Sequence, residues 1–182
     1  MSMNASLNAV LAFWREAGPS NWFRKDEAFD TEIRTRFLTT YQAAAAGQLA
    51  DWEATAETAL ALVVVLDQFP RNIFRGSAQA FAADAPARAV ADRALARGFD
   101  QQVPAGERQF FYLPFEHSEN ISDQERCLAL FRSTGNPDSL KWAEKHADII
   151  RRFGRFPHRN AVLGRTTTAE EQAFLNAGGF AG

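Results

Sequence analysis

The chain has 182 residues, a length typical of one domain, and 46% of them are hydrophobic while 23% are charged. This composition predicts a globular protein and excludes a disordered chain. The formal net charge of -2 argues against a protein that binds nucleic acid or a membrane surface through an overall positive charge. We therefore predict a single domain over residues 1–182.

Targeting and membrane segments are not evident in the sequence. The first residues, MSMNASLNAVLAF, lack the basic start and the long apolar core of a signal peptide. The longest apolar run, from Ala59 to Leu66, is far too short to span a membrane. The single cysteine, Cys127, excludes an internal disulfide and a cysteine-based zinc site. We expect a soluble, cytoplasmic protein that uses no cofactor and no metal ion.

The periodicity of the apolar residues predicts helices along the chain. One stretch, ALALVVVLDQF, is ambiguous because a short apolar run fits a buried strand as well as a buried helix. The helix-forming residues before it favour one buried helix that ends or bends at Pro70. Capping patterns predict helix starts at Ser122 and at Thr168, each with a glutamate three residues later. The predicted helices span about 7–17, 26–47, 53–69, 86–96, 107–115, 122–131 and 137–153, with a short one from 168.

These elements predict an all-α fold. Antiparallel helices joined by short loops suit either a compact bundle or a stack of helical hairpins. No persuasive internal repeat of about 34 residues is visible in the sequence, so the periodicity by itself does not favour the stacked arrangement.

The segment from Ile149 to Ala169 contains five arginines and His158 but no acidic residue. Guanidinium groups carry a permanent charge and bind carboxylate or phosphate through two parallel hydrogen bonds. One interpretation is a site for an anionic ligand. The other is that carboxylates from elsewhere in the fold, such as Asp67, Glu116 or Glu119, neutralise the arginines.

Within this segment, a turn from Gly154 to Asn160 presents several polar side chains. Gly154 permits a positive φ and Pro157 restrains the backbone, so we expect the side chains between and after them to be held in place. Such a turn suits a binding site, and it equally suits a tight structural corner. The candidate ligand-binding residues here are Arg155, His158, Arg159 and Asn160, followed by Arg165.

Two other polar motifs follow apolar stretches. The string LDQFPRNIFRG ends the buried helix and contributes the candidates Arg71, Asn72 and Arg75. The string PFEHSEN contributes His117 and Glu119, and a histidine beside glutamates invites an acid–base or metal interpretation. No histidine pair has the spacing of metal ligands, so we predict no metal site. His146, on an apolar helix face, is expected to be a hydrogen-bonded core residue.

The strings LDQFPRNIFRG, FFYLPFEHSE and FGRFPHRNAVLGR together resemble the bacterial domain-of-unknown-function 924 family, and the likeness covers nearly the whole chain. The resemblance implies a tetratricopeptide-repeat-like α–α superhelix and no established activity. The polar motifs of the family fall here on Asp67, Gln68, Arg71, Asn72, Arg75, His117, Ser118, Glu119, Arg155, His158, Arg159, Asn160 and Arg165.

Three functional hypotheses follow. The preferred one is a binding module in which the three motifs form one cleft for a small anionic molecule or an acidic or carboxylate-ended peptide. The second is an enzyme in which His117 or His158 acts as general base, Glu119 orients it and arginines hold an anionic substrate. The third is a structural scaffold whose polar network is internal. No catalytic residue is assigned, and the sequence does not predict the oligomeric state.

Overall fold

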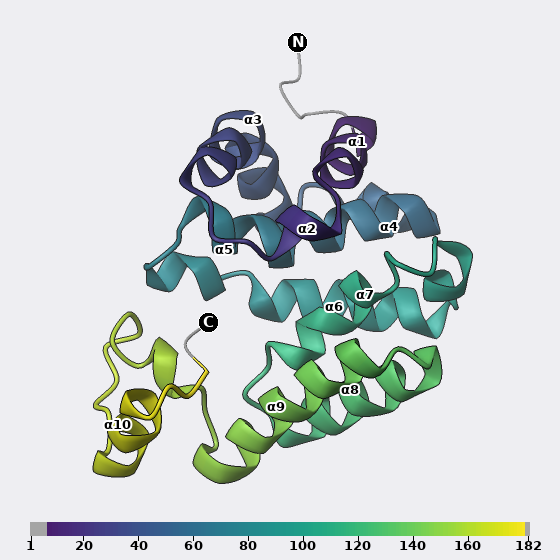
Figure 1. The fold of residues 1–182 in the computed structure, drawn as a ribbon. Helices are drawn as coiled ribbons and strands as arrows, with labels where there is room; N and C mark the ends of the chain where they lie inside the picture. The colour runs from purple at the N-terminus through teal and green to yellow at the C-terminus, as the bar shows by residue number, and fades with distance from the viewer. Residues whose placement is uncertain (1–6, 181–182) are drawn as a thin grey trace. The chain divides into compact units, whose positions relative to one another are not determined.

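The computed structural model describes residues 7–180. All regular secondary structure in this range is helical, which confirms the predicted all-α fold (Figure 1). The chain divides into two compact units, which we treat separately. Unit 1 comprises the described part of Met1–Arg75 together with Gln79–Pro114, and unit 2 comprises Gly76–Ala78 and the described part of Phe115–Gly182. One domain over 1–182 and a tetratricopeptide-like superhelix stay predictions.

Unit 1 is built from short helices around an aromatic core. Its helices α3 and α5 pack against each other, as do α4 and α6. The elements are α1 (Leu7–Ala17), α2 (Pro19–Trp22), α3 (Glu27–Ala45), α4 (Ala56–Val63), α5 (Phe69–Ile73), α6 (Asp84–Ala96) and α7 (Gln109–Glu116), whose last two residues belong to unit 2.

Aromatic rings from four elements meet at the centre of unit 1. Phe69 is fully buried, and its ring centroid lies 5.0 Å from that of Phe37 and 5.7 Å from that of Trp14. Trp14 in turn contacts Phe110 edge-on at 5.5 Å. Offset and edge-on pairs of this kind stabilise a core beyond the area that they bury. The high phenylalanine content of the sequence is used here to join α1, α3, α5 and α7.

The predicted end of a helix at Pro70 is wrong. The chain is helical without interruption from Ala56 to Ile73, because a π-helical segment, Val64–Gln68, lies between α4 and α5. In this segment the amide of Phe69 donates to the carbonyl of Val64, five residues back. Pro70 lies just after this wider turn, where the regular α-helical ladder is already interrupted, so its missing N–H does not end the helix.

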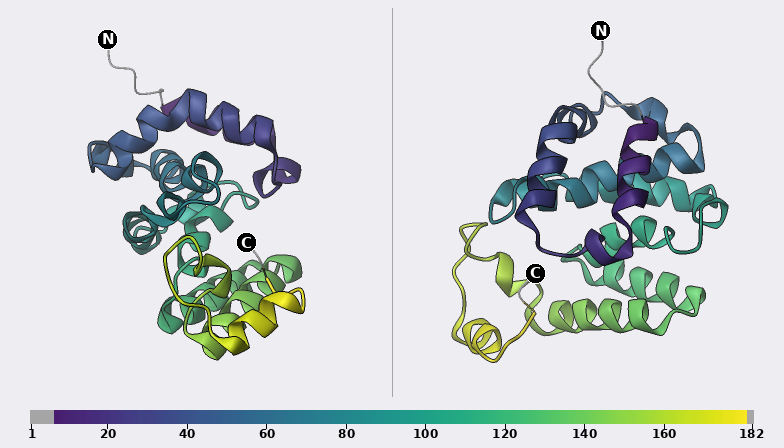
Figure 2. Two further views of the ribbon diagram at one scale, coloured as in Figure 1. Left: turned by 90° about the vertical axis from the view of Figure 1, so that its left-hand side faces the viewer. Right: turned by 45° about the horizontal axis from the view of Figure 1, so that its top comes forward.

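Unit 2 contains α8 (Ile121–Thr134), α9 (Pro137–Phe153) and α10 (Ala169–Asn176). Helices α8 and α9 pack side by side as a hairpin, as Figures 1 and 2 show. Gly135, in the left-handed conformation, ends the first helix and Asn136 caps the second, which spans 137–153 as the sequence predicted. The predicted capping box at Ser122 is wrong, because the side chain of Asn120 instead accepts the Ser122 amide.

The predicted capping box at Thr168 is confirmed. The Thr168 side chain accepts the amide of Glu171, and the Glu171 carboxylate accepts the amide of Thr168 at 2.8 Å. Helix α10 therefore begins where its sequence predicts. Among residues 7–180, no helix is long and apolar enough to cross a membrane.

We expect Phe69→Ala to lower the free energy of unfolding by about 3–5 kcal/mol, because it removes a ring at the centre of the unit 1 core. Phe23→Ala is a matched control, because the Phe23 side chain is 61% exposed. Its effect should stay within about 0.5 kcal/mol. Urea denaturation followed by tryptophan fluorescence measures both changes. Equal losses for the two variants would contradict the proposed core.

Candidate functional site

The unit 1 candidates Arg71, Asn72 and Arg75 make ion pairs and hydrogen bonds within that unit. Arg71 lies 3.3 Å from a carboxylate oxygen of Asp67, which is fully buried in the π-helical segment, and 3.0 Å from one of Asp84. It also donates a hydrogen bond to the backbone carbonyl of Asp67. Through these contacts the Arg71 guanidinium links α5, at the end of the helical stretch Ala56–Ile73, to α6.

Asp30 of α3 engages the other two polar side chains of this motif. Arg75 donates to both of its carboxylate oxygens, at 2.6 and 2.8 Å, and the Asn72 amide donates to one of them at 2.8 Å. This is the paired geometry that arginine favours with carboxylates. The motif therefore ties α5 to α3.

In unit 2, Glu171 of α10 neutralises Arg155. Arg155 donates to the two oxygens of Glu171 at 2.6 and 2.9 Å, and it also donates to the carbonyl of Thr166. The Asn160 amide donates to the same carboxylate at 3.1 Å. Hydrogen bonding from Arg155 and the backbone amide of Thr168 lowers the pKa of Glu171 from 4.5 to about 2, although burial opposes the change.

Glu119 forms the second pair of this network. Arg165 donates to both Glu119 oxygens, at 2.7 and 3.0 Å, and the Phe156 amide donates to one of them at 2.7 Å. Burial raises the pKa of Glu119, but these hydrogen bonds outweigh burial and hold it below its ordinary value. Arg165 also donates to the side-chain oxygen of Asn160. Carboxylates from outside the acid-free segment thus engage Arg155 and Arg165.

The remaining candidates of unit 2 are His117, His158 and Arg159. Arg159 is buried, and its guanidinium carbon lies 4.5 Å from the centre of the Phe156 ring. The His158 and Phe156 ring centroids lie 5.6 Å apart. The turn from Pro157 to Arg159 packs against α10. The unit 2 candidates thus belong to one unit, and their convergence with the unit 1 candidates in a single cleft stays a prediction.

His146 is a buried, hydrogen-bonded residue of α9, as the sequence predicted. Its Nδ1 atom lies 2.9 Å from the carbonyl of Trp142 and 3.3 Å from a carboxylate oxygen of Glu116. The pKa of His146 is lowered from 6.5 to about 3, chiefly by burial, while the hydrogen bond with the Trp142 carbonyl opposes the change and electrostatic interactions with His117, Arg159 and His158 favour it. His146 is therefore neutral near pH 7. Within residues 7–180, no group of three or more His, Cys, Asp or Glu side chains could hold a metal ion.

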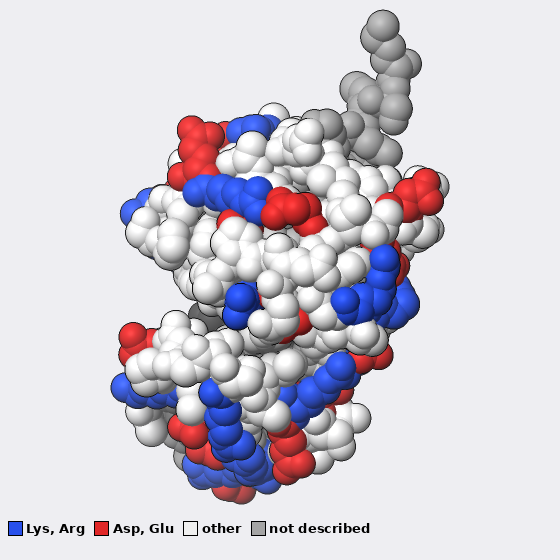
Figure 3. Space-filling view, turned by 90° about the vertical axis from the view of Figure 1, so that its right-hand side faces the viewer, with Lys and Arg blue, Asp and Glu red and all other residues white. Residues whose placement is uncertain are grey.

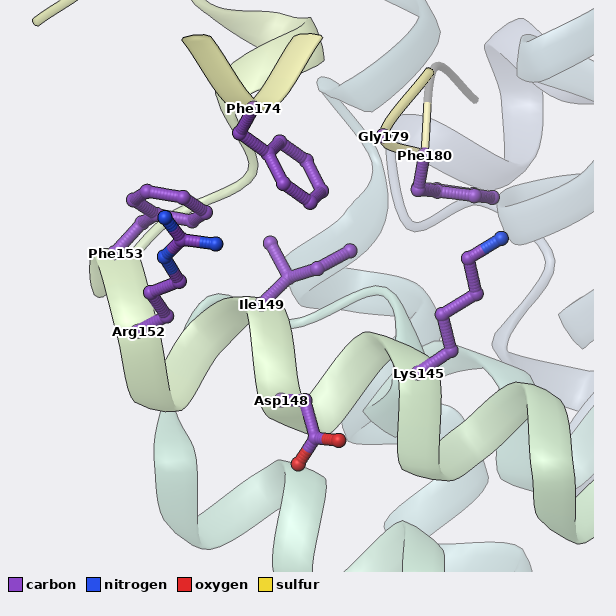
Figure 4. Close-up of a pocket in the computed structure, with 8 residues that line it drawn as sticks. All are labelled: Lys145, Asp148, Ile149, Arg152, Phe153, Phe174, Gly179 and Phe180. Carbon is purple, nitrogen blue, oxygen red and sulfur yellow. The ribbon is translucent and has the colours of Figure 1, made fainter. Parts of the chain in front are cut away.

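A pocket of about 210 Å³ lies between α9, α10 and the residues that follow α10 (Figure 4). Its apolar walls belong to the smaller core of unit 2, against which three partly buried phenylalanines pack. The lining residues are Lys145, Asp148, Ile149, Arg152, Phe153, Phe174, Gly179 and Phe180.

The charged side chains around this pocket differ in their partners. Arg152 pairs with Glu170 at 2.9 Å, and Asp148 pairs with Arg151 at 2.8 Å. Lys145 instead lies over aromatic rings, with its ammonium 4.8 Å from the Trp142 centroid. In the described part of the chain, no carboxylate lies within ion-pair distance of Lys145. The pocket therefore combines apolar walls with a cation that has no acidic partner there.

Phe180 connects this pocket to the histidines. Its ring lines the pocket, and its centroid lies 4.5 Å from that of His146 and 5.1 Å from that of His158. Sequence reasoning missed Lys145 and Phe180, because one is an ordinary lysine on an exposed helix face and the other follows the last predicted helix. The spacing of Ile149 and Phe153 on one face of α9 was the only sequence signal for an apolar wall.

Acidic and basic side chains are also mixed on one face of the protein (Figure 3). Figure 3 shows basic and acidic side chains interspersed over the face that it views, in keeping with a formal net charge of -2. The arginines Arg155 and Arg165 of unit 2 belong to a network of local ion pairs.

We expect the free energy of unfolding to fall as the pH drops from about 4.5 toward 2, because the unfolded chain takes up a proton on Glu171 in this range and the folded chain does not. Glu171→Gln should lower stability at pH 7 and flatten this part of the pH profile. Glu170→Gln is the matched control, because the neighbouring Glu170 side chain is 64% exposed. Thermal unfolding at a series of pH values measures both. Identical profiles for the two variants would contradict the role of Glu171.

We expect His146 to stay neutral in the folded protein down to pH 5, because its pKa lies at about 3. An unfolded histidine takes up its proton near pH 6.5, so this residue lowers stability as the pH falls from about 6.5. NMR titration of the imidazole Cε1–H resonance, assigned with a His146→Gln variant, measures the pKa. A titration midpoint between pH 6 and 7 would contradict the prediction.

Comparison with known proteins places the chain in a family without an assigned activity. No protein with a curated description matches it. The solved structure of a protein of unknown function from Agrobacterium tumefaciens is similar, with 47% sequence identity, a TM-score of 0.92, and coverage of 97% of this chain and 99% of that one. Residues 10–179 match the family described as bacterial protein of unknown function (DUF924). With nearly its whole length matched, the chain belongs to this DUF924 family.

Proposed function

We propose that the protein is a binding module for a small anionic ligand, and that the ligand occupies the unit 2 pocket between α9 and α10. The observation that carries this proposal is Lys145, a cation without an acidic partner among the described residues, at the edge of apolar walls. A ligand with an apolar body and one negative charge would complement both features.

The size of the pocket limits the ligand. At about 210 Å³ it is smaller than the roughly 300–1,000 Å³ of pockets for drug-sized molecules. A long peptide or a nucleotide would not fit inside it. Among the ligand classes expected from the sequence, the pocket therefore favours a small anionic molecule over an acidic peptide.

The predicted ligand-binding residues receive two roles in this proposal. The side chains that form ion pairs or hydrogen bonds with one another stabilise the fold. We assign this role to Arg71, Asn72, Arg75, Glu119, Arg155, Asn160 and Arg165. His158, whose ring contacts Phe180, borders the pocket. His117 and Arg159 lie close enough to His146 to act on it electrostatically, and Arg159 carries a permanent positive charge there.

The enzymatic alternative has less support from the geometry. It requires Glu119 to orient a histidine base, but both oxygens of Glu119 accept hydrogen bonds from Arg165, and one also accepts the Phe156 amide. His146 has a carboxylate within 4 Å, but it is buried and has a pKa of about 3, which is far from the range that suits a general base at neutral pH. We therefore assign no catalytic residue.

We expect a small carboxylate with an apolar body to raise the melting temperature of the protein. At a concentration 100-fold above its Kd, binding adds about 2.7 kcal/mol of stability, which corresponds to roughly 5–10 °C for a chain of this size. A thermal-shift screen would use acetate, pentanoate, phenylacetate, benzoate and phosphate as probes. The apolar carboxylates should produce the largest shifts.

The matched variants are Lys145→Gln and Lys141→Gln, because Lys141 is an exposed lysine one turn earlier on α9 and does not line the pocket. Lys145→Gln should abolish the ligand-induced shift, and Lys141→Gln should retain it. A shift that is equal in both variants, or the absence of any shift in the unmodified protein, would refute the proposed function.

A further inference from the structure

The ring of Phe180 lies among aromatic side chains and one cation of α9 and the neighbouring turn. It contacts His146, His158 and Trp142 edge-on, with centroids 4.5, 5.1 and 6.4 Å away. The Lys145 ammonium lies 5.5 Å from the ring centroid. We call this set of four side chains the aromatic seat. Edge-on rings and a nearby cation are the surroundings that an aromatic ring prefers.

Two glycines bring Phe180 to this seat. Gly178 has a φ of +77° and ends α10, with its amide donating to the carbonyl of Leu175. The amide of Gly179 donates to the carbonyl of Phe174 at 3.0 Å. Together these two hydrogen bonds form a Schellman motif, a common C-terminal cap of helices. This turn folds the chain back toward α9.

The backbone at Gly179 also leaves no room for a side chain. A Cβ atom there would lie 2.6 Å from two carbons of the Phe174 ring and 2.6 Å from the Phe174 carbonyl oxygen. Figure 4 shows Gly179 and Phe180 above α9, with the Lys145 ammonium beside the Phe180 ring. The glycine permits the close approach that seats the ring.

Within residues 7–180, Phe180 is kept in the aromatic seat by side-chain contacts. Its ring is only partly buried, and no backbone hydrogen bond of Phe180 occurs among those of residues 7–180. Segments with few buried contacts and few backbone bonds open at low free-energy cost. The ring can therefore leave its seat while α9 and α10 stay folded.

We propose that Phe180 is an internal occupant of the aromatic seat, and that the ligand is a small aryl carboxylate whose ring takes its place. This proposal rests on the binding function proposed above and specifies the ligand class of that site. The ring of the ligand would contact the edges of His146 and His158, and its carboxylate would pair with Lys145. Phe180 thus competes with the ligand for one position.

Charge and position argue for a carboxylate close to the ring. Lys145 is the cation of the aromatic seat, whereas Arg152, at the other end of the pocket, already pairs with Glu170. Because the Lys145 ammonium lies beside the ring, a carboxylate one or two bonds from an aryl group would reach it. Departure of Phe180 also enlarges the pocket of about 210 Å³ that it lines, so that a substituted ring fits.

Phenylacetate and pentanoate are suitable probes, because both carry one carboxylate and only the first has a ring. Their Kd values for the full-length chain and for Phe180→Ala would be measured by isothermal titration calorimetry. If the Phe180 ring occupies the seat nine-tenths of the time, its removal strengthens phenylacetate binding about tenfold. Pentanoate should gain less, since it lacks the ring that the seat favours.

Two further variants control this experiment. Phe180→Leu keeps an apolar side chain but removes the ring, so phenylacetate affinity should lie between those of the full-length chain and Phe180→Ala. Phe23→Ala removes an exposed phenylalanine of unit 1 and should leave the affinity unchanged. Circular dichroism checks that each variant keeps its helical content.

The outcomes separate this inference from the function on which it rests. If phenylacetate binding depends on Lys145 but is unchanged or weaker in Phe180→Ala, then Phe180 is a wall of the pocket, and the inference fails while the proposed function stands. Equal gains for pentanoate and phenylacetate would refute the aryl specificity. If no probe binds the full-length chain or any variant, both proposals fail.

Discussion

The carboxylate of Glu171 accepts hydrogen bonds from three parts of unit 2 while only 2% of the residue is exposed. Arg155 binds it from the turn after α9, Asn160 binds it from the end of that turn, and the Thr168 amide binds it from the start of α10. A buried carboxylate is stable only when its charge and its hydrogen-bonding capacity are satisfied. The position of α10, and with it the pocket wall and the residues that follow, depends on this arrangement.

The same requirement explains how an arginine-rich segment exists in a chain of net charge -2. Arg165 pairs with Glu119, and Arg152 pairs with Glu170, so acidic residues before and after the segment supply its counter-charges. Arginine suits this use because its planar group makes two directed bonds with one carboxylate. The directed hydrogen bonds of this network orient the side chains, in addition to neutralising their charges. Lys145 is not part of the network, and we assign it to the binding of a ligand.

The proposed site combines a rigid part and a loosely held part. Its walls belong to α9 and α10, which are held by the Glu171 network and by packing of Phe153 against Phe174. Its occupant, Phe180, follows two glycines and is held by contacts of its ring with neighbouring rings, with the Lys145 ammonium and with the apolar core of unit 2. Such a division allows a ligand to replace the occupant without disturbing the network. A binding protein of this kind would couple ligand affinity to the position of Phe180.

The sequence by itself determined the all-α fold, most helix boundaries and the capping of α10, because these follow from apolar periodicity and from bonds between neighbouring residues. Local rules failed at Pro70, where a π turn replaces the expected helix end, and at Ser122, where Asn120 provides the cap. The sequence also singled out the arginine-rich turn, but its residues carry no information about which distant carboxylate each would meet.

Only the tertiary structure decided the partners of the arginines, the burial of His146 and the pocket beside Lys145. Glu119 and Arg165 are 46 positions apart, and Asp30 and Arg75 are 45 apart, so no local pattern predicts either pair. Phe180 reaches α9 only because the backbone turns tightly at Gly178 and Gly179. Ion pairs and ring contacts form between residues that are distant in the sequence and that folding brings together. For this reason the sequence indicated several polar residues of unit 2 but not their partners or the pocket.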